Sequence, residues 1–258
     1  MKTTSAKESA MRFKQKTEDR LFAQPRRSID DFNFGKETAA VFDDMLDRSV
    51  PFYAEIQRMV AELAADFAAP DTAIYDLGCS TCNTFLQIAK FLPAGVNPRF
   101  IGLDSSPEML EIARHKLTEE GFGYEYELRC ANLDRDIEVR KASVVLLVLT
   151  LQFVRPLQRE RLIRSIAQGL ADNGCLILVE KVLGESSTFN RLFIKHYYEM
   201  KKRNGYTDLE IAQKREALEN VLIPYRLEEN KELLRGQGFQ HVDVFFKWYN
   251  FCGMLAMR

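Results

Sequence analysis

Apolar residues follow two different periods along this chain. Between Ala54 and Phe67 they recur every three to four positions, which predicts a helix. Shorter apolar runs bounded by polar residues predict strands at 73–77, 99–104, 124–130, 142–149 and 175–180. Helical patterns lie between strands, and Ser106 followed by Pro107 marks a helix start. This alternation predicts an α/β fold with a doubly wound, mostly parallel sheet.

The pattern changes after Lys181. Residues of about 185–236 are predicted to form a helical insertion, in which Thr207 and Glu210 have the spacing of a capping box. Residues 241–258 indicate two strands joined by a short polar connection, and therefore an antiparallel hairpin at the sheet edge. The hairpin brings the predicted sheet to seven strands.

The N-terminal part differs from the rest of the chain. Residues 1–30 are polar and lack periodicity, which predicts a mobile leader. We expect residues 31–258 to form one domain that contains the helical insertion.

The charge balance argues against direct contact with nucleic acid. The chain has 36 Lys and Arg residues against 37 Asp and Glu residues, whereas binding to phosphates relies on a basic excess.

The N-terminus lacks the apolar core of a signal peptide, and no segment approaches the roughly 18 consecutive apolar residues of a membrane span. We therefore expect a cytoplasmic protein that binds neither nucleic acid nor membrane.

The loop after the first predicted strand is the main candidate for ligand binding. Open α/β sheets bind ligands outside the carboxyl ends of their strands. Here the loop is Asp76-Leu77-Gly78-Cys79-Ser80, in which Gly78 lets a ligand approach the backbone. Asp104 ends the second strand, where a carboxylate can accept hydrogen bonds from both hydroxyls of a ribose. The loop lacks the further glycines that a dinucleotide pyrophosphate needs, so S-adenosylmethionine fits better than NAD.

Asn132 and Leu133 follow the third predicted strand. They could hold an adenine through one polar and one apolar contact. A turn with a capping asparagine is the simpler interpretation when these residues are considered alone.

Cys79 and Cys82 form a C-x-x-C pair in the first loop. A structural zinc site would need a second pair of ligands, but Cys130, Cys175 and Cys252 are isolated and the three histidines show no paired spacing. We therefore expect no metal site. A thioredoxin-like motif also follows a strand and opens a helix, so redox chemistry remains an alternative.

Several segments together point to a specific family: "FDDMLDRSVPFY", "YDLGCS", "LDSSPEML", "TLQF", "NGYTDLEIAQKREALENVL" and "GFQHVDVFFKWYNFCGMLAMR". From about Phe32 to the C-terminus the chain resembles the carboxy-S-adenosyl-L-methionine synthase family. The resemblance implies the class I methyltransferase fold and the conversion of S-adenosylmethionine and prephenate to carboxy-S-adenosylmethionine and phenylpyruvate. It also implies a homodimer, whose product a partner enzyme, a tRNA carboxymethyltransferase, uses to modify the wobble uridine.

The resemblance further implies which residues bind the ligand. Those that would hold its nucleoside and methionine parts are Tyr53, Gly78, Cys79, Ser80, Asp104, Ser105, Asn132 and Leu133. Arg215, within "QKR", would bind the added carboxylate, which a planar guanidinium can meet with two parallel hydrogen bonds. Without the family, Arg215 would be an ordinary surface charge.

Two positions of the presumed cofactor pocket depart from the family pattern. Cys82 stands where the family typically has its second loop glycine, and Val148 where it has an asparagine that contacts the cofactor. A change from asparagine to valine removes hydrogen-bonding groups. Two alternatives therefore stay open: a diverged S-adenosylmethionine-dependent methyltransferase acting on a small molecule or tRNA, and a cofactor-binding protein whose partner performs the chemistry.

Overall fold

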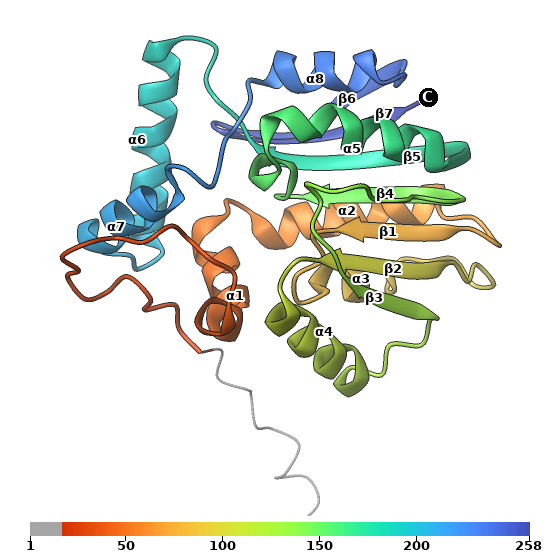
Figure 1. Cartoon of the computed structure of the whole chain (residues 1–258), viewed down its shortest axis with the longest axis horizontal. Helices are drawn as coiled ribbons and strands as arrows, with labels where there is room; N and C mark the ends of the chain where they lie inside the picture. The colour runs from red at the N-terminus through yellow and green to blue at the C-terminus, as the bar shows by residue number, and fades with distance from the viewer. Residues whose placement is uncertain (1–16) are drawn as a thin grey trace, which may run out of the picture.

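The computed structural model describes residues 17–258. Its centre is a sheet of seven strands in the order β3-β2-β1-β4-β5-β7-β6 (Figure 1). The strands are β1 (Ala73–Leu77), β2 (Arg99–Asp104), β3 (Tyr126–Cys130), β4 (Ala142–Val148), β5 (Leu170–Lys181), β6 (His241–Trp248) and β7 (Phe251–Met257). The first five pair in parallel, whereas β7 is antiparallel to both β5 and β6. The predicted mostly parallel seven-stranded sheet with a terminal hairpin is confirmed.

The central strands are apolar because both faces of the sheet are covered. Successive residues of a strand point to opposite faces. Ile74 and Val144 therefore pack among the side chains of α2, α3 and α4, while Tyr75 and Val145 pack among those of α5 and α8. The continuous apolar runs in the sequence thus reflect two cores, one on each face.

The helices follow the strands in the order expected for a doubly wound sheet. They are α1 (Lys36–Ser49), α2 (Tyr53–Phe67), α3 (Asn83–Ile88), α4 (Pro107–Glu119), α5 (Pro156–Gly169), α6 (Ser187–Arg203), α7 (Asp208–Leu218), α8 (Leu227–Gly236) and the short 3-10 helix η1 (Leu151–Phe153). Ser106 caps α4 as predicted, because its Oγ accepts a hydrogen bond from Met109 N at 3.1 Å. Within residues 17–258, no helix combines the length and apolar character needed to cross a bilayer.

The helical insertion is confirmed as α6, α7 and α8, although residues 219–226 between the last two are not helical. Thr207 and Glu210 form the predicted capping box at the start of α7. α6 and α7 lie beyond the carboxyl ends of the parallel strands, at the left of Figure 1. They are therefore placed to cover a ligand bound there.

The strand predicted at 175–180 begins earlier, at Leu170. Ala142 of β4 pairs with Leu170, but Val144 already pairs with Cys175, so the residues between them bulge out of the ladder. Asn173 in this bulge has a φ of 61°, a left-handed conformation that asparagine tolerates well. Polar residues typical of a turn are here accommodated within one long strand.

Residues 17–35, which we call the N-terminal strap, pack against α7. Residues 1–16 of the expected leader lie outside the described residues. The rest of it, 17–30, is part of the folded unit, since Asp19 and Phe22 are buried and Tyr206 Oη donates to Asp19 Oδ2 at 2.6 Å. The domain boundary expected near residue 30 therefore falls earlier, because these side chains have partners that are distant in sequence.

Gln213 of α7 fastens the strap through three hydrogen bonds. Its Nε2 donates to the carbonyl oxygens of Phe22 at 2.8 Å and Gln24 at 2.9 Å, and its Oε1 accepts from Arg26 N at 2.8 Å. Gln213 is itself buried. One side chain thus satisfies three backbone groups of an irregular segment that has no sheet or helix to do so.

We predict that Gln213→Ala releases residues 20–27 of the strap. The buried backbone groups lose their partner, and each unsatisfied group costs about 1–3 kcal/mol. Amide hydrogen exchange of this segment should accelerate, and the free energy of unfolding should fall. Glu216→Ala, at an exposed position of the same helix, serves as the control. Equal exchange of the segment in both variants would contradict the role given to Gln213.

Candidate functional site

A cavity of 240 Å³ opens at the carboxyl ends of the parallel strands. Asp76, Asp104, Val148 and Lys181, from β1, β2, β4 and β5, all line it. Its volume has room for on the order of 20 water molecules, and so for a metabolite. This is the edge at which open α/β sheets bind ligands.

The cavity brings together most of the residues implied by the sequence. Those that line it are Tyr53, Gly78, Cys79, Ser80, Asp104, Ser105, Asn132, Leu133 and Val148. Arg215 is not among the lining residues, and it lies on the exposed side of α7. Its neighbour Lys214 does line the cavity. In the single chain, the guanidinium expected to meet a carboxylate is therefore outside the site.

Gly78 is required by the geometry of the first loop. Its φ is 87°, and a Cβ added to it would lie 2.4 Å from Oγ1 and Cγ2 of Thr150. Gly78 N and Cys79 N both donate to the carbonyl oxygen of Leu103, at 2.7 Å and 2.9 Å. These bonds hold the loop against the end of β2, where its residues line the cavity.

Asp104 is fixed at the tip of β2 by two backbone N–H groups. Its Oδ2 accepts from Ser80 N at 2.9 Å and its Oδ1 from Ser106 N at 2.9 Å. Burial raises the pKa of Asp104 above its ordinary value, and the backbone hydrogen bonds oppose that rise. Each carboxylate oxygen has a second acceptor position, so both can still receive a ligand hydroxyl.

Asp43 of α1 ties the far side of the loop to two helices. Its Oδ1 accepts from Thr81 Oγ1 and Asn83 Nδ2, both at 2.8 Å, and its Oδ2 pairs with Lys116 Nζ of α4 at 2.6 Å. Burial acts to raise the pKa of Asp43, but the Lys116 ammonium and the hydrogen bonds from Lys116, Thr81 and Asn83 together outweigh it, and the pKa is lowered. The ionised carboxylate of Asp43 thus holds the loop rigidly at Thr81 and Asn83.

Asp76 belongs to the expected ligand-binding loop, but the sequence pattern predicts no role of its own for it, and the structure places it in β1. It lines the cavity, is buried, and its Oδ1 has no hydrogen-bond partner within residues 17–258. Burial, and then repulsion by Asp104, raise its pKa to about 7. A carboxyl group without a partner in such a place fits a cationic group of a ligand. The signal in the sequence was an acid inside the otherwise apolar strand "AIYDL".

Asn132 both forms a turn and lines the cavity, so the two interpretations of this residue, a capping turn and a contact for adenine, are compatible. Its Oδ1 accepts from Asp134 N at 2.8 Å, which is the turn expected from the simpler interpretation. The same residue lines the cavity beside the buried Leu133. The turn therefore fixes the position that an adenine would contact.

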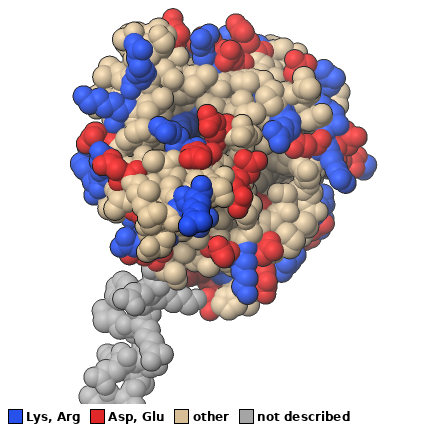
Figure 2. All heavy atoms as spheres, turned by 60° about the vertical axis from the view of Figure 1, so that its left-hand side comes forward, with Lys and Arg blue, Asp and Glu red and all other residues tan. Residues whose placement is uncertain are grey.

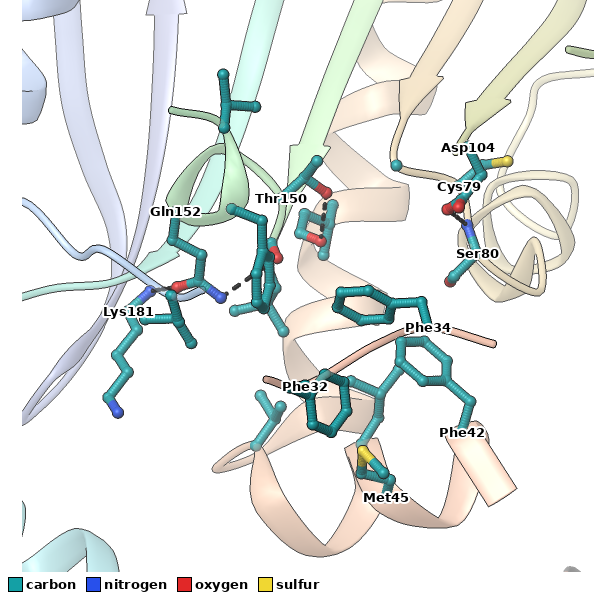
Figure 3. A pocket seen from close by; sticks show the side chains of 18 of the residues that line it. Phe32, Phe34, Phe42, Met45, Cys79, Ser80, Asp104, Thr150, Gln152 and Lys181 are labelled. Carbon is teal, nitrogen blue, oxygen red and sulfur yellow. Dashed lines mark hydrogen bonds between the residues drawn. The ribbon is translucent and has the colours of Figure 1, made fainter. Parts of the chain in front are cut away.

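Aromatic rings form one wall of the cavity, and the sequence pattern did not reveal them (Figure 3). Phe34 of the strap packs edge-on against Phe153 at 5.2 Å and against Phe42 of α1 at 6.2 Å. Ser106 Oγ donates to the carbonyl oxygen of Phe34 at 2.7 Å. The strap therefore covers part of the cavity with Phe32 and Phe34.

The C-x-x-C pair does not have the surroundings of a reactive thiol. Cys79 and Cys82 are both buried. The hydrogen bond with Cys82, followed by burial, raises the pKa of the Cys79 thiol well above its ordinary value, whereas reactive cysteines have a lowered pKa. Among residues 17–258, no three His, Cys, Asp or Glu side chains are grouped so that they could hold a metal ion.

Comparison with known proteins identifies the family. The chain is 58% identical over 241 residues to the carboxy-S-adenosyl-L-methionine synthase of Methylococcus capsulatus, a match that covers 93% of this chain and 99% of the relative. A second relative of the same name, from a Nitratiruptor species, is 41% identical over 93% of this chain and 98% of its own length. The chain belongs to the carboxy-S-adenosyl-L-methionine synthase family.

The wider comparisons agree with this family. A family model described as "Methyltransferase domain" matches residues 74–174. An O-methyltransferase family protein from Burkholderia thailandensis has the same fold, with a TM-score of 0.63 at 16% identity over 90% of this chain. Our chain covers 65% of the length of that structure, and it similarly spans about three fifths of other methyltransferase structures it matches. This member of the synthase family is therefore a transferase that uses S-adenosylmethionine.

Cys82, where the resemblance described above implies glycine, has a φ of 59°. We predict that Cys82→Gly is more stable than Cys82→Ala by about 1 kcal/mol, because a side chain in the left-handed region is strained. Both variants lose the buried thiol, so their difference in free energy of unfolding isolates the backbone. At Gln87 within α3, the same two substitutions should rank in the opposite order. If Cys82→Ala were the more stable of the two variants, the backbone at position 82 would not be strained.

We predict that Asp76 makes the ligand-free protein less stable as pH rises. Its pKa of about 7 exceeds the unfolded value near 3.8. A carboxyl group with a raised pKa favours folding fully only below the unfolded pKa, and that contribution is lost as pH rises through the folded pKa. Between pH 4 and 7, urea unfolding should show a smaller loss of stability for Asp76→Asn than for the wild type, by roughly a few kcal/mol. If the free energy of unfolding changed with pH in the same way in Asp76→Asn and the wild type, Asp76 would not be the group responsible.

Proposed function

We propose that this protein is a carboxy-S-adenosyl-L-methionine synthase, which converts S-adenosylmethionine and prephenate to carboxy-S-adenosylmethionine and phenylpyruvate. The observation that supports this most is the 58% identity, over nearly the whole chain, with the synthase of Methylococcus capsulatus. The cavity is consistent with the proposal, because it offers one set of groups for a nucleoside and another for charged substituents.

The residues of the cavity fit S-adenosylmethionine. In our proposal, Asp104 accepts the ribose hydroxyls while Asn132 and Leu133 contact the adenine. The backbone of Gly78-Cys79-Ser80, with Ser105 and Tyr53, surrounds the remainder of the molecule. The unpartnered Oδ1 of Asp76 is a suitable acceptor for the ammonium group of the methionine part.

The proposed reaction balances without an external oxidant or reductant. The sulfonium makes the methyl carbon acidic, so loss of a proton gives an ylide. Prephenate loses its ring carboxyl group as carbon dioxide and its hydroxyl as hydroxide when the ring becomes aromatic. The ylide carbon bonds to the carbon dioxide, and the proton and hydroxide leave as water. The chain's part is to align two charged substrates and to exclude solvent.

Arg215 keeps its proposed role as the partner of the new carboxylate. Because it is exposed in the single chain, this role requires either a movement of α7 or a second copy of the chain. We propose that the protein is a homodimer.

The product is proposed to serve a separate tRNA carboxymethyltransferase. On the face shown in Figure 2, basic and acidic side chains are interspersed, and the chain has no basic excess. Direct binding of tRNA through phosphate neutralisation is therefore not part of the proposal.

One observation favours a second candidate, a methyltransferase that acts on a small molecule or tRNA. Val148 lines the cavity and offers no side-chain hydrogen bond to a ligand, although the family pattern has an asparagine there. The two candidates differ in the mass of the product and in the need for prephenate. Native mass spectrometry of the purified protein would show which nucleoside copurifies.

We predict that purified protein, S-adenosylmethionine and prephenate labelled in its ring carboxyl group yield a labelled, carboxylated nucleoside. Arg215→Leu should keep the fold and some S-adenosylmethionine binding but lose this product, because the new carboxylate lacks its partner. Arg203→Leu, an exposed arginine in the last turn of α6, is the matched control.

Absence of label from the sulfonium compound with the wild type would refute the synthase. Methylated product without prephenate would favour the methyltransferase, and binding without turnover would favour a non-catalytic protein. Unchanged product yield in Arg215→Leu would reject only the role of that residue.

A further inference from the structure

Three lysines gather around two tyrosine rings, and two of these lysines, Lys181 and Lys214, line one end of the cavity. Lys181 Nζ, from the end of β5, lies 5.0 Å from the centre of the Tyr197 ring. Lys201 Nζ of α6 lies 5.5 Å from the same ring and 5.3 Å from that of Tyr206. Lys214 Nζ of α7 lies 5.4 Å from the Tyr206 ring. We call these three side chains the lysine cluster.

The lysine cluster has fewer acidic partners than ammonium groups. Lys214 Nζ pairs with Asp19 Oδ2 at 3.4 Å and donates to Ser49 Oγ at 3.2 Å. For Lys181 and Lys201, the structure of residues 17–258 shows no ion pair and no hydrogen bond of the ammonium group, only the ring contacts. Lys201 is nonetheless 4% exposed. Lys201 is therefore buried and Lys181 is half-buried, and neither ammonium group has an ion pair with an acidic side chain.

The pKa values of the three lysines are lowered in this cluster, which has more ammonium groups than acidic partners. Burial lowers the pKa of Lys201 to about 7, and repulsion by Lys214 and Lys181 adds to the shift, while Asp19 and Glu210 oppose it. Burial likewise lowers the pKa of Lys181 and of Lys214 to about 8. An anion placed among these groups would favour their charged forms and be bound in return.

The cluster lies at the opposite end of the cavity from the nucleoside residues. Lys181 and Lys214 line the cavity, as Asp104 does. In the sheet, β2 and β5 are separated by three strand-to-strand steps, or about 14 Å at about 4.8 Å each. Figure 3 accordingly shows Lys181 and Asp104 on opposite sides of the view. A nucleoside on β1 to β3 leaves the end formed by β5, α6 and α7 for a second molecule.

We propose that the lysine cluster is the binding site for the carboxylates of the co-substrate, an organic dicarboxylate. This inference rests on the proposed function, in which the co-substrate is prephenate. Lys181 and Lys214 line the cavity and Lys201 adds a third positive charge beside the Tyr197 ring, so the cluster matches the charge of two carboxylates. The Tyr197 ring, which also lines the cavity, suits a carbon skeleton. A second cation, such as the sulfonium, is repelled from this end and so is kept toward Asp76 and Asp104.

The test compares Lys181→Met, Lys201→Met and Lys181→Arg with Lys195→Met, an exposed lysine of α6. In the first two variants we expect the KM for prephenate to rise roughly tenfold to a hundredfold, as for loss of a hydrogen bond to a charged group. The Kd for S-adenosylmethionine should stay unchanged. Lys181→Arg should recover much of the loss, and Lys195→Met should behave as the wild type. Methionine at a buried position without an ion pair should leave folding intact.

A binding measurement keeps this inference separate from the synthase activity. Malonate, a simple dicarboxylate, should raise the midpoint of thermal unfolding of the wild type and of Lys195→Met, but not of Lys181→Met or Lys201→Met. This result without carboxylated product would support the anion site and refute the synthase. Carboxylated product with an unchanged KM for prephenate in both methionine variants would refute the anion site and leave the synthase standing. An equal rise in the Kd for S-adenosylmethionine and the KM for prephenate would also refute the anion site, because the lysines would then act on the whole cavity.

Discussion

The carbonyl oxygen of Leu103 is the point on which the site depends. It accepts hydrogen bonds from Gly78 N and Cys79 N, and so joins the loop after β1 to the end of β2. From that join, Ser80 N reaches the carboxylate of Asp104. A backbone interaction between two neighbouring strands therefore sets the distance between the loop and the acid that face the cavity. Gly78 permits it, since any side chain there would collide with Thr150.

The strands were predictable because their sequences are determined by burial on both faces. β1 and β2 have the predicted bounds, and Asp104 and Gly78 were found because they stand at strand ends, where ligands of such sheets lie. Asx-turn and capping residues such as Asn132 and Ser106 act within two or three positions, so their geometry is also encoded locally.

Most of the features that escaped prediction join distant parts of the chain. Asp19 is a polar residue in a polar segment, and it is buried through contacts with residues distant in sequence, such as Tyr206 and Lys214. Phe34 shows no period because the strap is neither helix nor strand. The lysine cluster draws one residue each from β5, α6 and α7. Local sequence spacing cannot reveal such groups, because their members come together only in the tertiary structure.

α7 links the cover of the cavity to its cationic end. Gln213 holds the strap, the next residue, Lys214, lines the cavity, and the carbonyl oxygen of Ala217 accepts from Phe32 N at 2.8 Å. These attachments lie within about 6 Å along one rigid helix, at about 1.5 Å per residue. Any displacement of α7 caused by an arriving or departing anion is thus transmitted to the strap. One helix thus carries both the hydrogen bonds that hold the strap and a lysine that lines the cavity.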